Sequence, residues 1–209
     1  MRLWPRRQGS SLDLLVVGLG NPGREYEKTR HNLGFIVIDA FAQKLGLAWQ
    51  LHPQFEAQVA RWEKSRGVTW LLVKPQTFMN ESGSAIAALA RFYKLAPANV
   101  IAVYDDLNIE LGRVKVTTTG SDGGHNGVAS LLSHLGDGFT RYRIGIGPKS
   151  PPQMDLKDFV LGKLSPPELS LIEKTLLYYT DGLGLLIDSG AAQAMNQLNR
   201  RDKNDPDQT

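Results

Sequence analysis

LLVVGLGNPGREYEKTRHNLG, residues 14–34, joins a run of apolar residues to a glycine-rich segment. The apolar run predicts a buried strand over residues 13–19. Gly18, Gly20 and Gly23 follow in the G-x-G-x-x-G spacing of a dinucleotide-binding turn. In such a site the third glycine lies in a helix whose apolar face packs on the sheet. Whether a helix begins here therefore decides both the local fold and the first functional hypothesis.

The residues after the turn argue against a dinucleotide site. Residues 23–32, GREYEKTRHN, contain only Tyr26 as a large apolar side chain. Asn21 precedes Pro22, and a residue before proline is disfavoured in helical geometry. One feature keeps this alternative open, because FIVID can be a second strand that ends in acidic Asp39 about 20 residues further on. A glycine turn without chemistry is another alternative, but it leaves the polar side chains of this stretch unexplained.

Strand and helix patterns alternate along the rest of the chain. Strands are predicted at 13–19, 55–63, 68–75, 99–106, 113–120 and 139–147, and helices at 32–45, 80–95, 126–136, 165–179 and 191–198. The strands between residues 55 and 75 predict an antiparallel hairpin with a turn near 65–67, and residues 148–163 are predicted as a loop. Ser165-Pro166-Pro167-Glu168 is a capping box. We therefore expect an α/β fold, a single three-layer domain whose mixed, mostly parallel central sheet is flanked by helices.

Length and composition limit the class of protein. A chain of 209 residues with 42% hydrophobic content fits one domain, which we expect over residues 13–198. Residues 1–12 are predicted to be a flexible extension and residues 199–209 a polar tail. No apolar run approaches the roughly 20 residues of a membrane span, and no secretory signal is recognisable, so we expect a soluble, unsecreted protein. The absence of cysteine excludes disulfides and thiolate nucleophiles, and the net charge of +3 suits an anionic partner.

Polar groups recur where the predicted strands end. Asn21 follows the first strand, Asn80 follows LLVKPQTFM, Asp105 follows VIAVY, and His125-Asn126 follows a glycine-rich turn at a helix start. Loops at the carboxyl ends of parallel strands line one crevice in open α/β sheets. We therefore expect these groups to meet, with His31 joining them from the start of the first helix.

This set of residues favours hydrolysis by water. It contains a histidine and an aspartate but no protein nucleophile, so water is the candidate nucleophile. A histidine oriented by a carboxylate can act as general base, and asparagine side chains can hold a carbonyl and a developing oxyanion. The histidines, at positions 31, 52, 125 and 134, match no metal-ligand spacing. We expect no metal and no cofactor, and we expect His52 and His134 to be structural.

Five segments together resemble the bacterial-type peptidyl-tRNA hydrolase family. They are VVGLGNPGREYEKTRHNLG, KPQTFMNESG, VYDDLNIELG, GSDGGHNG, and RIGIG followed by FVLGKL, in the order of that family, over residues 14–182. The resemblance implies a cytoplasmic, monomeric, metal-free esterase. Its substrate would be peptidyl-tRNA, cleaved at the ester between the peptide and the 3′ ribose, and the product would be free tRNA.

The resemblance also implies roles for individual residues. His31 would be the general base that activates water, and Asp105 would orient it. Asn21 and Asn80 would hold the substrate near the ester, and Asn126 would position water and help the oxyanion. The remaining matches are Tyr26 near the tRNA end, Met79 as an apolar wall and His125 as a supporting histidine. Without the resemblance, Asn80 and Asn126 are equally candidates for helix N-caps and Met79 for a core residue.

Basic residues on the strands after Asp105 are the candidates for phosphate contacts. Arg143 matches a tRNA-binding position of the family. Lys115 and Arg113 belong to the alternating strand predicted at 113–120, which we expect to lie nearby. Thr117 stands at another position that is basic in the family, and GSD replaces a segment that often contains histidine and glycines in the family.

Two alternative functions remain: a non-catalytic RNA-binding relative, which the joint presence of His31 and Asp105 disfavours, and an NAD-dependent oxidoreductase. The sequence leaves open whether residues 148–163 close over the substrate.

Overall fold

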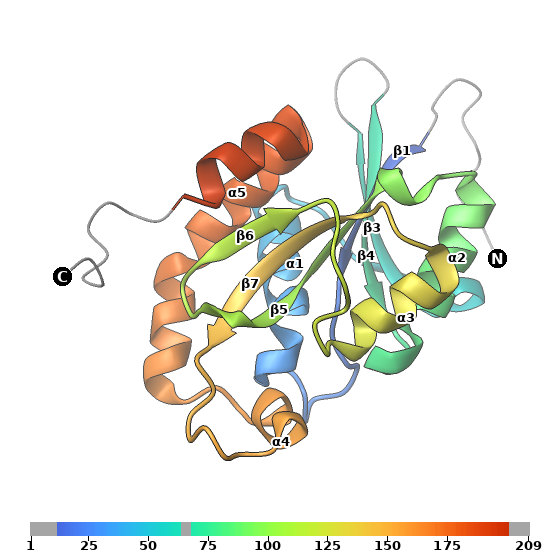
Figure 1. The fold of residues 1–209 in the computed structure, drawn as a ribbon. Helices are drawn as coiled ribbons and strands as arrows, with labels where there is room; N and C mark the ends of the chain where they lie inside the picture. The colour runs from blue at the N-terminus through green and yellow to red at the C-terminus, as the bar shows by residue number, and fades with distance from the viewer. Residues whose placement is uncertain (1–11, 64–67, 201–209) are drawn as a thin grey trace.

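The computed structural model describes residues 12–63 and 68–200, in which one mixed sheet forms the centre of the fold (Figure 1). Its strand order is β2-β3-β4-β1-β5-β7-β6. The strands are β1 Leu12–Gly18, β2 Gln50–His52, β3 Ala57–Glu63, β4 Thr69–Pro75, β5 Val100–Glu110, β6 Val114–Thr117 and β7 Thr140–Gly147. The central strands β4, β1, β5 and β7 are parallel, whereas β2–β3, β3–β4 and β6–β7 pair antiparallel. The mixed sheet and its hairpin are confirmed, although the hairpin turn itself lies outside the described residues.

Helices cover both faces of the sheet and complete three layers (Figure 1). The helices are α1 Leu33–Lys44, α2 Ser82–Tyr93, α3 Asn126–Leu135, α4 Leu156–Leu161 and α5 Pro166–Leu198. One apolar core joins α1 and α5 to the sheet, and a second core joins α2 and α3 to the opposite face. The predicted α/β architecture is confirmed. Among the described residues, no helix combines the length and apolar character needed to cross a membrane.

The glycines of the opening motif allow close packing between β1 and α1. The chain forms turns after Gly23, and α1 begins only at Leu33. A Cβ atom on Gly34 would lie 2.4 Å from the carbonyl oxygens of both Leu19 and Val103, so only glycine lets α1 approach the sheet this closely. A Cβ atom on Gly20 would likewise lie 2.6 Å from the Phe35 ring. The helix that a dinucleotide site requires at this turn does not form, and that alternative is wrong.

Two segments near the C-terminus differ from the prediction. The predicted loop 148–163 contains α4, whose first turn is capped by Asp155 and whose Phe159 is buried. The predicted helix end at Tyr179 is also wrong, because α5 continues to Leu198 with a non-helical residue at Gly190. The buried side chains of Leu183 and Leu186 explain this continuation, since tertiary packing overrides the low helix propensity of the glycines in this stretch.

Smaller differences concern the ends of other elements. Strand β2 was not predicted, and β5 continues to Glu110 rather than ending at residue 106. Leu12 pairs with Thr69 within the sheet, and the carboxamide of Asn199 bonds the backbone of Val116 at the edge of β6. Of the predicted extension 1–12 and the predicted tail 199–209, residues 1–11 and 201–209 lie outside the described residues.

We expect Gly83→Ala to destabilise the fold, because α2 and α3 approach each other closely at this position. A Cβ atom on Gly83 would lie 2.0 Å from the carbonyl oxygen of Ser130, which is backbone and cannot move aside cheaply. Overpacking of this kind typically costs about 1–3 kcal/mol. Thermal unfolding of the variant beside Gly184→Ala, a helical glycine whose new Cβ would meet only the Phe41 ring at 3.8 Å, separates crowding from the general effect of replacing glycine. An unchanged melting temperature for Gly83→Ala would contradict the close packing.

Candidate active site

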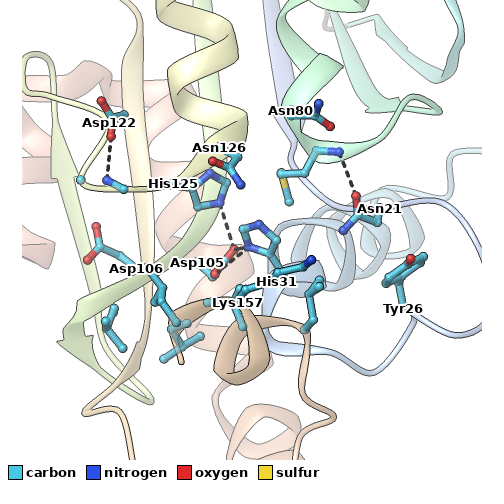
Figure 2. A pocket seen from close by; sticks show the side chains of 18 of the residues that line it. Asn21, Tyr26, His31, Asn80, Asp105, Asp106, Asp122, His125, Asn126 and Lys157 are labelled. Carbon is cyan, nitrogen blue, oxygen red and sulfur yellow. Dashed lines mark hydrogen bonds and ion pairs between the residues drawn. The ribbon is translucent and has the colours of Figure 1, made fainter. Parts of the chain in front are cut away.

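A cleft of about 540 Å³ lies at the carboxyl ends of the central strands. Its walls come from the loops after β1 and β4, from β5 and β7, from the start of α3 and from α4 (Figure 2). Eight of the residues singled out in the sequence line it: Asn21, Tyr26, His31, Met79, Asn80, Asp105, His125 and Asn126. The prediction that these groups share one crevice is confirmed.

Two histidines bind one carboxylate at the base of the cleft (Figure 2). His31 Nδ1 lies 3.1 Å from both carboxylate oxygens of Asp105, and His125 Nε2 lies 3.1 Å from Oδ1. All three residues are buried. Burial alone would raise the pKa of Asp105, but the adjacent His31 and His125 imidazoles hold this pKa well below its usual range. Asp105 is therefore an anion at neutral pH.

Backbone contacts fix the proton positions in this cluster. His125 is the N-cap of α3, and its Nδ1 accepts hydrogen bonds from the backbone N–H groups of Gly127 and Val128. The proton of the neutral ring must then be on Nε2, where it is donated to Asp105. The Asp105 anion also accepts the Nδ1–H of His31. The lone pair of His31 therefore lies on Nε2, and no described residue forms a hydrogen bond with that atom.

The same hydrogen bonds make the cluster a poor metal site. His31, Asp105 and His125 each offer a ligand atom within 4.8 Å of the others. A metal on Nε2 of His125 would move the ring proton to Nδ1, where it would face the two backbone N–H groups. The donor set therefore fits a hydrogen-bonded acid–base group better than a metal ion.

The other two histidines, His52 and His134, do not line the cleft, and His134 forms a hydrogen bond with the carbonyl of Ser130 in its own helix.

Asn21 is held by hydrogen bonds on three of its polar atoms. Its Oδ1 accepts the backbone N–H of Met79 at 2.8 Å, so the side-chain amide NH₂ remains to serve as a donor. Asn32 bonds the backbone N–H and carbonyl of Asn21 at 2.8 and 2.9 Å. This role of Asn32 was not predicted, because nothing in the spacing of the two asparagines indicates that one side chain clamps the other's backbone.

Asn80 and Asn126 do not act as the helix caps that were weighed as alternatives. Asn80 lies in a short 3-10 turn, Met79–Glu81, and forms no cap hydrogen bond. Asn126 is the first residue of α3, whose cap is His125. Both asparagines are exposed in the cleft, which leaves their amides available to a ligand. Met79 is buried in the apolar core and also lines the cleft, so it is both a core residue and part of the wall.

The predicted phosphate-binding residues lie beside the cleft rather than in its lining. Arg143 of β7 donates to Asp106, a lining residue, at 2.8 Å. Lys115 of β6 is the direct cross-strand neighbour of Arg143, and Thr117 lies two residues further along. Arg113 instead reaches the carbonyl of Arg200 at the C-terminal end of α5. The structure thus brings Lys115, and not Arg113, next to Arg143.

Several residues of the cleft were missed by the sequence analysis. Phe78 is 57% exposed although it is a large apolar side chain, and Leu156 of α4 is 40% exposed. Both line the cleft, as do Lys157 and Val160 of α4. The signal for α4 was present: Asp155 precedes Leu156, and the apolar residues 156, 159 and 160 have helical spacing. Nothing in the sequence indicates that Phe78 is exposed.

Comparison with known proteins agrees with this geometry. The family description peptidyl-tRNA hydrolase matches residues 15–206. Peptidyl-tRNA hydrolase of Synechocystis sp. is 46% identical over 90% of this chain and 96% of its own length, and that of Anaeromyxobacter dehalogenans is 44% identical over 90% and 97%. The crystal structure of peptidyl-tRNA hydrolase from Acinetobacter baumannii superposes with a TM-score of 0.81 at 37% identity, covering 91% of this chain and 97% of that one. Sequence and structure together show that this chain belongs to the peptidyl-tRNA hydrolase family.

Proposed function

We propose that this enzyme hydrolyses the ester that joins a peptide to the 3′ ribose of its tRNA, with His31 as general base. The observation that supports this most strongly is the hydrogen-bond chain His125–Asp105–His31, which leaves the Nε2 lone pair of His31 unshared at the cleft. A histidine in this tautomer can take a proton from water at neutral pH. The family's substrate supplies the ester.

In the proposed step, water attacks the carbonyl carbon of the ester while His31 Nε2 takes one of its protons. The carbonyl π bond opens to an oxyanion, and the imidazolium that forms is stabilised by the Asp105 anion. The oxyanion then re-forms the carbonyl, the bond to the ribose oxygen breaks, and His31 returns the proton to that oxygen. The products are a free peptide acid and a tRNA with an intact 3′ hydroxyl.

Amide groups around His31 are the proposed substrate contacts. The oxygen of Asn21 is occupied by the backbone N–H of Met79, so its NH₂ group is the part that can donate to a ligand acceptor such as a peptide carbonyl. We assign Asn80 to holding the substrate beside it, and Asn126 to positioning water and stabilising the oxyanion. Tyr26 and the supporting His125 complete the proposed site.

A non-catalytic RNA-binding role is less consistent with the geometry. Such a role has no need for a buried carboxylate that fixes the tautomer of a neighbouring histidine, and burying that charge is costly unless it is paired. The paired cluster is therefore best explained by catalysis.

The face formed by Arg143 and Lys115 is proposed to bind tRNA phosphates. Val114 and Val116 of β6 pack toward α5, so the alternating Lys115 and Thr117 lie on the opposite face of the sheet. That face is continuous with the cleft through the Arg143–Asp106 pair. Lys115 offers the positive charge that Thr117 does not.

We expect Lys115→Ala to weaken tRNA binding and to lower its salt dependence. Each phosphate contact contributes a slope of about one to the plot of log affinity against log salt, so the slope should fall by about one. Titration with deacylated tRNA at several salt concentrations measures this. Lys174→Ala, an exposed lysine of α5, is the matched control. Equal slopes for the wild type and Lys115→Ala would contradict the assignment.

We further propose that the enzyme acts as a monomer in the cytoplasm. One chain supplies the proposed base, the carboxylate that orients it and the candidate substrate amides, so the proposed chemistry needs no second subunit. The proposed substrate is produced by ribosomes, which accounts for the cytoplasmic assignment.

The proposed activity is tested by incubating the purified protein with peptidyl-tRNA and, separately, with aminoacyl-tRNA. We expect release of free tRNA from peptidyl-tRNA and much slower release from aminoacyl-tRNA. In aminoacyl-tRNA the α-amino group of the esterified residue is a charged ammonium, whereas in peptidyl-tRNA it is part of a peptide bond. No release from either substrate by the folded protein would refute the proposed function.

A further inference from the structure

Arg30 directly precedes His31, but it does not line the cleft. Its guanidinium binds Glu168 of α5 with two parallel hydrogen bonds, Nε to Oε1 at 3.0 Å and Nη2 to Oε2 at 2.9 Å. Glu168 also accepts hydrogen bonds from the backbone and hydroxyl of Ser165. Burial alone would raise the pKa of Glu168, but the hydrogen bonds from Ser165 and Arg30 hold it below its ordinary value.

The third nitrogen of Arg30 is directed to the end of α4. Nη1 lies 3.2 Å from the carbonyl oxygen of Phe159 and 3.3 Å from that of Gly162, and the guanidinium carbon lies 4.5 Å from the centre of the Phe159 ring. The Phe159 carbonyl also accepts the N–H of Gly162, and the Gly162 carbonyl also accepts the N–H of Arg30, so the Arg30 side chain adds a second donor to each of these carbonyls at the end of α4. One side chain thus joins the His31 segment, the end of α4 and the start of α5.

Backbone hydrogen bonds run beside this side chain. Arg30 N–H donates to Gly162 at 3.2 Å, Leu164 N–H donates to Lys28 at 2.8 Å, and Thr29 and Lys163 form an isolated β-bridge. The segment that carries His31 is therefore attached to the residues that follow α4, which are about 130 positions away in the sequence.

α4 depends on these contacts because it is short. It has six residues, well below the length at which an isolated helix is stable in water. It nevertheless contributes Leu156, Lys157, Val160 and Leu161 to the wall of the cleft. The position of that wall relative to His31 therefore depends on what holds the end of α4.

We propose that Arg30 is a positioning residue that fixes the α4 wall of the cleft against the segment presenting His31, so that the wall holds peptidyl-tRNA in register with the base. This inference rests on the proposed function for its substrate. The geometric part, that Arg30 orders α4, stands on the contacts alone. Small misplacements of a bound substrate can change reaction rates by up to about 10²-fold.

Arg30→Lys tests the proposal, because lysine keeps the charge but cannot make the forked contacts of a guanidinium. We expect kcat for peptidyl-tRNA to fall about tenfold or more, because the substrate is no longer held in register with the base, while KM stays within about twofold. The pH profile of kcat should not move, because the His31–Asp105 pair is intact. Amide hydrogen exchange over residues 156–161 should become faster. Glu168→Gln should give the same pattern, and the double variant should add little to either single change.

Lys44→Ala is the matched control. Lys44 of α1 forms an ion pair with Asp181 of α5, so it also joins a helix to α5, but neither residue lines the cleft. We expect wild-type kcat and wild-type exchange in α4 for this variant. A folded Arg30→Lys enzyme with wild-type kcat, or with unchanged exchange over 156–161, would overturn the proposal. If the wild type and Lys44→Ala both fail to hydrolyse peptidyl-tRNA, the proposed function fails, whereas the exchange measurement still decides whether Arg30 orders α4.

Discussion

His31→Ala is expected to lower kcat for peptidyl-tRNA by about 10²–10⁴-fold, the contribution typical of a positioned general base. The side chain is the group with an unshared lone pair at the cleft next to Asp105, and no other described residue is placed to replace it. KM should change little, because the asparagine amides that are proposed to hold the substrate remain.

The His31→Ala protein should fold. Asp105 keeps its hydrogen bond from His125, so its carboxylate is not left without a partner. Circular dichroism and thermal unfolding provide the control. A folded variant with wild-type kcat would show that another group activates water.

Asp105→Asn should lower kcat by on the order of 10³–10⁴-fold, as an amide replacement does in the aspartate–histidine pair of serine proteases. Asparagine has one oxygen and one NH₂ group. Its oxygen can accept from His125 Nε2, and its NH₂ group then faces His31 Nδ1. His31 would have to carry its proton on Nε2, which leaves no lone pair at the cleft to accept a proton from water.

The tautomer change gives a second measurement for Asp105→Asn. Nitrogen-15 chemical shifts of the His31 ring should show the proton moving from Nδ1 to Nε2, together with the loss of kcat. A kcat within a few-fold of the wild type, or an unchanged tautomer, would contradict the role of Asp105. Asp106→Asn is a useful control, because Asp106 lies in the same cleft but binds Arg143 instead of a histidine.

The pH dependence of stability follows from the lowered pKa of Asp105. The folded protein holds this pKa below its unfolded value of about 3.9, so the folded state binds fewer protons there. The stabilisation is fully present above the unfolded value and is lost as the pH falls through the folded value. The difference in the free energy of unfolding between the wild type and Asp105→Asn, measured by chemical denaturation at several pH values, should therefore be constant near neutral pH. It should become smaller only under strongly acidic conditions.

Much of the candidate site could be predicted from the sequence because its residues follow strands. Asn21, Asn80 and Asp105 come at or near the ends of apolar runs, and the central strands are parallel, so their carboxyl ends meet at one edge of the sheet. The glycine-rich turn before α3 is not explained by this rule, because it follows β6, which is antiparallel to β7 and ends at the opposite edge of the sheet.

The placement of the α4 wall could not be predicted in the same way, although Asp155 and the apolar residues after it carry a local helix signal. The segment containing α4 is rich in proline and polar residues, and its helix is held by contacts with Arg30 that are remote in sequence. Long-range contacts of this kind have no local pattern. The clamp of Asn32 on Asn21 and the exposure of Phe78 are likewise decided by tertiary structure.

The length of α5 was underestimated for a related reason. Glycines at 182 and 184 indicate a helix end, but a Cβ atom on Gly182 would lie 2.6 Å from the hydroxyl of Tyr142. The glycine allows the helix to pack close to β7, and the Tyr142 hydroxyl donates to the Tyr179 carbonyl in the same region. A residue that reads as a helix breaker in isolation is therefore a packing residue in the folded chain.

The most direct test of the central claim is single-turnover hydrolysis of peptidyl-tRNA by the wild type and by His31→Ala, each with and without added imidazole. If His31 is the general base, the wild type should release tRNA at a rate that imidazole does not change. His31→Ala should be strongly impaired, and imidazole should restore part of its rate by occupying the space of the missing ring. Hydrolysis by folded His31→Ala at the wild-type rate, with no response to imidazole, would contradict the claim.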